Sequence, residues 1–360
     1  MTFEEARAQF PVLERFAHLN AGSLGPLSRP TLDAMAERMR FDQERGRGGK
    51  AWYDNLLALR ESVRDRVAAV IGALPERVAL TSSTTDGCNI VLSGLGLSAG
   101  DEVVTTDSEH PGLLLPLHVS GATVRVAEVA ARPTANALDE ILSHVTPRTR
   151  LIALSHVLWT TGQVMPVHEL KRETGLPVLV DGAQSVGAIP VDVGDLDFYT
   201  VSGQKWLCGP DPTGALYVRV PDELAVAIPT YFAQKSIERD GSFAPKDTAA
   251  RFDSGWLSPP YLAGLDAALA GTPEWRFERS AEIAARCRQA LAERFRVIGE
   301  AGGGTLVSFF SPGEPVQDAA RLYERGVIVR DLPGTPWLRA SCGWWTSDED
   351  VERLVAGLSR

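Results

Sequence analysis

Two polar residues follow consecutive apolar runs of the chain. Asp181 closes the run VLVD (178–181), and Lys205 lies just beyond the run DFYTVS (197–202). A carboxylate at the end of an apolar strand needs a partner, because burial of an unpaired charge is costly. The amine of Lys205, which lies among Gly203, Trp206, Leu207 and Gly209, is partly desolvated, which lowers its pKa and suits Schiff-base chemistry. Since one crossover separates the two runs, both side chains can reach the same end of a sheet.

The pair of Asp181 and Lys205 matches the needs of pyridoxal 5′-phosphate (PLP). The protonated pyridine nitrogen of PLP is a partner for a carboxylate, and its aldehyde condenses with a lysine amine. Taken singly, Asp181 could be a helix N-cap and Lys205 a surface lysine. Their coincidence at one sheet edge favours the cofactor.

Other polar turns follow apolar runs in the same way. In TSSTTDGCN (81–89), the backbone amides of Thr84 and Thr85 begin a helix and suit a phosphate, although a plain threonine cap remains the alternative. In DSEHPG (107–112), His110 precedes a helix and could stack on the cofactor ring, although a lone histidine is more often structural. Ser202 and Gln204 flank Lys205 as hydrogen-bond donors to the phosphate or the ring.

The elements that must position these residues alternate between strand and helix. Helices are predicted at 30–45, 54–71, 85–95, 111–119, 137–144 and 166–174. Short apolar runs, which predict strands, lie at 77–80, 101–106, 123–129, 150–155, 177–181 and 197–202. Because several runs are apolar on both faces, we expect an α/β fold with a largely parallel sheet covered by helices on both sides.

The pattern changes after about residue 250. A long amphipathic stretch at 259–295 is followed by short strands near 305–310, 327–330 and 337–341, and by a closing helix at 347–358 that begins with a capping sequence. We therefore predict a large PLP-binding α/β domain over 15–250 and a smaller C-terminal α+β domain over 251–360. Residues 1–14 are expected to pack near their junction.

Charge and composition narrow the class of protein. The 360 residues carry a net charge of −10, which argues against nucleic-acid or anionic-membrane partners. No run approaches the roughly 20 apolar residues of a membrane span, and the N-terminus lacks a signal-peptide core. The four cysteines lie far apart, so neither a metal site nor a disulfide framework is expected, and a cytoplasmic location fits best.

Taken in order, these motifs resemble fold-type I PLP enzymes of the class V aminotransferase and cysteine desulfurase group. The resemblance covers most of the chain and rests on HLNAGSLGP (18–26), TTDGCN (84–89), EHPG (109–112), DGAQS (181–185), SGQKW (202–206) and LRAS (338–341). It implies a PLP-dependent transferase fold, with a large domain built on a mostly parallel seven-stranded sheet. It also implies a homodimer.

The resemblance assigns further residues. Gln184 would bond the phenolate oxygen of PLP with His156 beside it, and Arg339 would bind the substrate carboxylate. Asn20, in the motif at the entry to the active site, becomes a second candidate for substrate binding. Gln204 stands where the family usually has histidine.

The resemblance also implies a contact from the second subunit. That subunit would reach the phosphate through RFDSGWLS (251–258), where Trp256 replaces a common threonine and Ser258 is a substitute.

A closer resemblance is to the cysteine/cystine C–S lyases, through LSHVLWTTGQVMP (154–166) and RASCGWWTSDED (339–350). This resemblance favours β-elimination from a small, sulfur-containing amino acid.

A cysteine desulfurase needs a mobile thiolate shortly before Arg339, and 325–339 contains no cysteine. Cys342 follows Arg339 at an odd spacing, which points it to the opposite strand face. An aminotransferase or an amino-acid epimerase could use the same lysine, aspartate and arginine, and a non-catalytic PLP-binding protein is disfavoured by that complete set.

Overall fold

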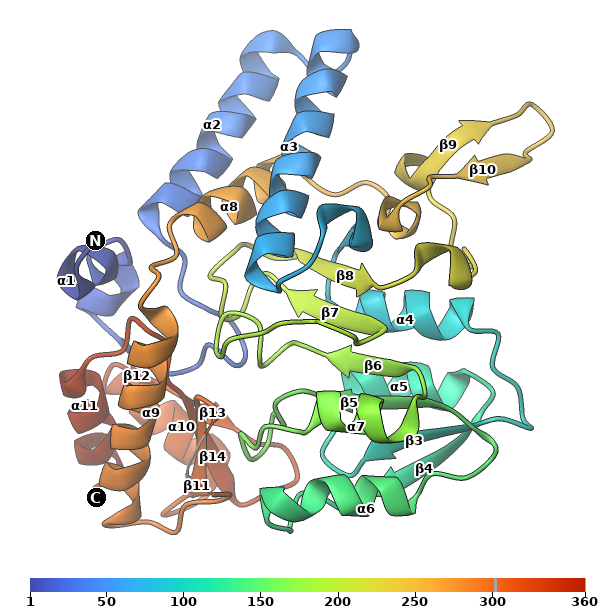
Figure 1. Cartoon of the computed structure of the whole chain (residues 1–360). Helices are drawn as coiled ribbons and strands as arrows, with labels where there is room; N and C mark the ends of the chain where they lie inside the picture. The colour runs from blue at the N-terminus through green and yellow to red at the C-terminus, as the bar shows by residue number, and fades with distance from the viewer. Residues whose placement is uncertain (301–302, 360) are drawn as a thin grey trace.

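A seven-stranded sheet with helices on both faces forms the larger part of the computed structural model, which describes residues 1–300 and 303–359 (Figure 1). The strand order is β2-β8-β7-β6-β5-β3-β4. Strand β8 runs antiparallel to β2 and β7, while the other pairs are parallel. The strands are β2 (Val78–Thr81), β3 (Glu102–Thr106), β4 (Thr123–Ala127), β5 (Thr149–Ser155), β6 (Val178–Asp181), β7 (Phe198–Ser202) and β8 (Gly214–Val218). The mostly parallel α/β sheet expected from the sequence is thus confirmed.

Two apolar layers cover the two faces of this sheet. One contains buried residues of α3, α6, α7 and α8, and the other contains those of α4 and α5. The helices are α2 (Arg29–Arg45), α3 (Lys50–Val70), α4 (Thr84–Gly94), α5 (Pro111–Val119), α6 (Ala137–Ser143), α7 (Val167–Thr174) and α8 (Pro259–Ala270). Every residue of β2, β3, β6, β7 and β8 is buried. The continuous apolar runs of the sequence follow from this two-sided burial.

A smaller antiparallel sheet, in the order β11-β14-β13, forms a separate core with the C-terminal helices. Its neighbours include β1, which pairs in parallel with β12 and so joins the N-terminal segment to this part. The elements are α1 (Phe3–Arg7), β1 (Ala17–His18), α9 (Arg276–Ala292), β11 (Leu306–Phe310), α10 (Pro315–Glu324), β12 (Val327–Ile328), β13 (Arg330–Asp331), β14 (Trp337–Ser341) and α11 (Asp348–Leu358). The division into 15–250 and 251–360 stays a prediction.

Three features differ from the expected elements. The stretch 259–295 is two helices, α8 and α9, because Gly271 and Pro273 interrupt it. Strand β8 and the hairpin of β9 (Gln234–Ile237) and β10 (Phe243–Pro245), which projects from the body of the molecule in Figure 1, were not expected.

No helix among the described residues is long and apolar enough to cross a membrane.

Candidate active site

The carboxyl ends of the parallel strands face the smaller sheet. In Figure 1 the arrowheads of β6 and β7 point towards β13 and β14. Thr106, Ser155, Asp181 and Ser202 are the last residues of β3, β5, β6 and β7, and all four are buried. Open parallel sheets bind ligands at this edge. The sequence-predicted residues therefore gather where the two parts of the molecule meet.

Asp181 presents one carboxylate oxygen that the described residues leave free. Its Oδ1 accepts a hydrogen bond from the backbone N–H of Ala183 at 2.9 Å, and the side chain is only 2% exposed. Oδ2 makes no hydrogen bond to the described residues. A buried carboxylate in this state suits a cationic N–H partner.

Lys205 lies in the loop that follows β7. Burial lowers the pKa of its amine to about 8; the charge of Asp181 opposes this shift, and that of Arg339 adds to it. The N-terminal segment packs against the same loop, because the N–H of Gly25 donates to the carbonyl of Gln204 at 2.8 Å. The lysine is therefore more often neutral, and more nucleophilic, than an exposed one.

His110 is the N-cap of α5, and its Nδ1 accepts from the N–H of Gly112 at 3.0 Å. Its pKa is lowered by burial and then by the charge of Lys205. Asp181 opposes that shift, and Arg339 and Arg330 add to it. His110 therefore lies close enough to Lys205, Asp181 and the two arginines for their charges to act on it. A neutral imidazole that faces such a site is suited to stacking on an aromatic ring.

A set of donors lies at the start of α4. Ser83 is its N-cap, so Thr84 and Thr85 occupy the first turn, where backbone N–H groups point out of the helix. The helices α4 and α5 begin side by side, since a Cβ on Gly112 would lie 2.5 Å from Thr85 Oγ1. Ser202 Oγ donates to the amide oxygen of Gln204 at 2.9 Å, which orients that amide. Two helix N-termini at one place form a good anion site.

Gln184 and His156 are held by other residues of the chain. The amide N–H of Gln184 donates to the carbonyl of Gly22 at 2.9 Å, and its oxygen accepts from Trp206 Nε1 at 3.0 Å. His156 Nδ1 lies 2.7 Å from the hydroxyl of Tyr199, and burial lowers the pKa of this histidine to about 4. Both side chains are therefore fixed in place, and the His156 imidazole is neutral.

Arg339, on β14, is 1% exposed and carries unused hydrogen-bonding capacity. Its Nη1 donates to the carbonyl of Trp159 at 2.8 Å, whereas its Nε has no partner among the described residues. Burial first, and then the charge of Arg330, lower its pKa to about 9. Asn20 forms a bridge to Ser341 on the same strand, and its buried Oδ1 is unpartnered as well. A carboxylate-bearing ligand would satisfy this arginine.

Sequence reasoning missed two residues that belong to this site. Arg330 on β13 lies directly opposite Arg339 on β14, so the two side chains share one face of the small sheet. The turn LPGT (332–335) between them was the signal for a hairpin. Glu109, which precedes His110 in the motif EHPG, is buried at the strand ends.

The four cysteines are all free and buried. Burial raises the pKa of the Cys208 thiol, and burial with the nearby Asp181 and Glu109 raises that of Cys88. Cys342 packs in the core of the smaller part, where its hydrogen bond to Cys287 and burial raise its pKa. Raised thiol pKa values work against the thiolate form that a nucleophile needs.

Comparison with known proteins agrees with this geometry. The family model described as aminotransferase class-V matches residues 26–354. The chain belongs to the class V aminotransferase family. This family is PLP-dependent, so the expected enzyme class, fold type and cofactor are confirmed.

Relatives within this family differ in activity. The isopenicillin N epimerase of Amycolatopsis lactamdurans is 31% identical, covering 98% of this chain and 97% of the relative. A cysteine desulfurase of an Enterobacter species is 30% identical, covering 99% of this chain and 97% of the relative. The solved structure of a cystine C–S lyase with its product cysteine persulfide has a TM-score of 0.91 and 31% identity, covering 97% of this chain and 99% of that one.

The site residues fit the family's cofactor. A carboxylate oxygen left free by the described residues, a partly buried lysine of lowered pKa and two adjacent helix N-termini match the ring nitrogen, the aldehyde and the phosphate of PLP.

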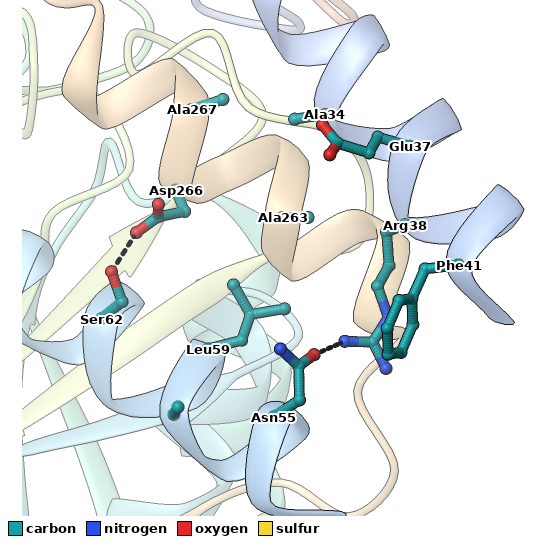
Figure 2. A pocket seen from close by; sticks show the side chains of 11 residues that line it. Ala34, Glu37, Arg38, Phe41, Asn55, Leu59, Ser62, Ala263, Asp266 and Ala267 are labelled. Atoms are coloured by element: carbon teal, nitrogen blue, oxygen red, sulfur yellow. Dashed lines mark hydrogen bonds between the residues drawn. The ribbon is translucent and has the colours of Figure 1, made fainter. Parts of the chain in front are cut away.

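A separate cavity of about 480 Å³ lies between α2, α3 and α8 (Figure 2). There Arg38 donates to the amide oxygen of Asn55, and Ser62 donates to Asp266 at 2.7 Å. None of the site residues above lines it.

Proposed function

We propose that this protein is a PLP-dependent lyase that breaks the Cβ–S bond of a small, sulfur-containing amino acid such as cystine or cysteine. The observation that carries the proposal is the absence, among the described residues, of an exposed cysteine for a desulfurase mechanism. The similarity to a cystine C–S lyase over nearly the whole chain supports the same choice.

In this proposal each side chain has one task at the cofactor. Lys205 would carry PLP covalently and Asp181 would pair with the ring nitrogen. The imidazole of His110 would cover the ring face, and Gln184 with His156 would lie beside the phenolate oxygen. The phosphate would bind at Thr84 and Thr85, with the amide N–H of Gln204 as a further donor that Ser202 orients. When bound, PLP supplies an electron sink for the carbanion at Cα.

The remaining residues of the site act on the substrate. Arg339 holds the α-carboxylate as a charge-assisted pair, with Asn20 beside it. Lys205 Nζ takes the Cα proton as general base, a task that suits a pKa of about 8. The electron pair of the Cβ–S bond leaves with the sulfur, and one water releases the three-carbon remainder as pyruvate and ammonia. From cystine, the sulfur product is cysteine persulfide.

The finer assignments of assembly and location belong to the same proposal. We infer a homodimer in the cytoplasm, in which the segment 251–258 of one subunit approaches the phosphate of the other.

The test is to incubate the PLP-loaded protein with L-cystine, L-cysteine and L-alanine, without an amino acceptor. Pyruvate and ammonia from cystine or cysteine are expected. Alanine from cysteine would instead mean desulfurisation, and altered stereochemistry at Cα without pyruvate would mean epimerisation.

Two variants of the experiment sharpen it. Iodoacetamide treatment of the folded holoprotein should leave turnover intact, because all four cysteines are buried. Arg339→Lys keeps the charge but loses the bidentate hydrogen bonding to the carboxylate, so the KM for the amino acid should rise on the order of tenfold or more.

A further inference from the structure

Glu109 joins the ends of two neighbouring strands at the cofactor edge. It is 4% exposed, and its Oε1 accepts from Thr106 Oγ1 at 2.6 Å. Its Oε2 accepts from both the backbone N–H and the hydroxyl of Ser155, at 2.8 and 2.5 Å. Thr106 ends β3 and Ser155 ends β5, which pair with each other in the sheet. One carboxyl group thus fixes the point where the chain leaves β3 for the turn that carries His110.

Further contacts tie this turn to the loop after β5. The hydroxyls of Ser108 and Thr160 form a hydrogen bond, and the rings of His110 and Trp159 meet edge to face at 5.4 Å. The carbonyl of Trp159 in turn accepts from Arg339. Glu109 therefore stands at the buried end of a series of contacts that leads past His110 to Arg339.

An acid at this position is costly for the fold. Burial raises the pKa of Glu109 to about 7, hydrogen bonds from Ser155 and Thr106 oppose that shift, and the charge of Asp181 adds to it. A position that needed only to be filled would be served at lower cost by an apolar side chain. The carboxyl is the group that can accept from three donors of two different strands at once.

We propose that Glu109 is a positioning residue of the cofactor site, which fixes the turn carrying His110 and so holds the imidazole in one orientation over the PLP ring. The inference rests on the proposed placement of His110. It holds for any substrate, because it concerns only the bound cofactor.

The first test compares Glu109→Ala with Glu109→Gln. The alanine variant should release PLP on the order of tenfold faster and lower the visible circular dichroism of bound PLP, because the turn loses three hydrogen bonds. The glutamine variant should recover most of both signals: its amide oxygen can accept from Ser155 while its N–H donates to the Thr106 hydroxyl.

Asp107→Ala is the matched control. Asp107 Oδ1 accepts from the N–H groups of Val129 and Ala130, so it ties the same turn to the segment that follows β4, the edge strand of the sheet. Both PLP signals should be unchanged in this variant. Equal effects of Asp107→Ala and Glu109→Ala would mean that general loosening of the turn is responsible, and would overturn the proposal.

A double-mutant cycle tests whether Glu109 acts through His110. Glu109→Ala should change PLP release little in a His110→Ala background, whereas fully additive effects would contradict the proposal. If Glu109→Ala does not fold, Ser155→Ala removes one donor and should show the same effects at smaller size. None of these readouts uses a substrate, so they stay valid if the lyase assignment fails.

Discussion

Asp181 and Arg339 are buried and Lys205 is partly buried, and the low exposure gives each of them a property that the fully exposed residue lacks. The Lys205 amine has a lowered pKa, and neither Oδ2 of Asp181 nor Nε of Arg339 has a hydrogen-bond partner among the described residues. Shifted pKa values and missing hydrogen-bond partners of this kind are typical of side chains that bind a ligand.

The pKa of Lys205 predicts how fast the protein captures its cofactor. Because burial lowers this pKa to about 8, the amine loses its proton at a lower pH than an ordinary lysine near 10.5. The rate of PLP attachment to the apoprotein should therefore rise with pH and level off above about pH 8. Stopped-flow absorbance measures this rate, and a rise that continues towards pH 10.5 would contradict the lowered pKa.

Some site residues could be predicted from the sequence and others could not, for a physical reason. Asp181 ends an apolar run and Lys205 follows one, so their place at the sheet edge follows from local pattern. Arg330 reaches the site only through its pairing with β14, and Glu109 through hydrogen bonds to Ser155, 46 residues away. The pairing of Arg330 is local, and the turn at 332–335 is its signal, whereas the contact of Glu109 depends on tertiary structure and leaves no local signal.

At the scale of elements, the N-terminal segment 20–25 closes the site from one side. Gly25 bonds to the Lys205 loop, and the carbonyl of Gly22 accepts from Gln184. A Cβ on Gly22 would lie 2.7 Å from Nη2 of Arg339 and 2.9 Å from Oγ of Ser341. Glycine is required here because the backbone passes so close to the arginine.

Gly22→Ala should therefore displace the Arg339 guanidinium. We expect a several-fold higher KM for the amino acid, because the carboxylate pair loses its geometry, while PLP absorbance stays unchanged. Steady-state kinetics and an absorbance spectrum measure the two effects. Gly100→Ala is the control, since a Cβ there would meet only Ser98 Oγ, at 3.9 Å. Equal KM values for the two variants would refute the close approach.

The elements themselves followed from apolar periodicity wherever burial was two-sided. The six strands β2 to β7 were predicted, because each is an apolar run closed by a polar turn. The pairing of β8 antiparallel to its neighbours was not predicted, since the direction of a strand depends on which strands it pairs with. The hairpin β9–β10 is largely exposed and carries no apolar pattern.

At the scale of the whole molecule, an aromatic patch of five residues remains partly uncovered. It comprises Trp52, Tyr53, Tyr231, Phe232 and Trp256. Trp52 stacks on Trp256 with ring centroids 6.3 Å apart, and Trp256 and Tyr231 are 52% and 72% exposed. Contiguous exposed aromatic side chains favour association with another protein surface.

The proposed homodimer predicts that this patch is covered by the second subunit. Trp256→Asp should shift the protein from dimer towards monomer, because a charge would be buried at an apolar interface. Light scattering after size-exclusion chromatography measures the mass. Val316→Asp, at a residue 60% exposed on α10, should leave the dimer intact. A Trp256→Asp variant that remains fully dimeric would place the interface elsewhere.

Covalent attachment of PLP to Lys205 is the central claim, because every other role is defined relative to it. The most direct measurement is borohydride reduction of the PLP-loaded protein, followed by peptide mapping by mass spectrometry. We predict one pyridoxyl group per chain, on the peptide containing Lys205, and none in Lys205→Ala. Stoichiometric labelling of another lysine, such as Lys171 or Lys246, would contradict the account.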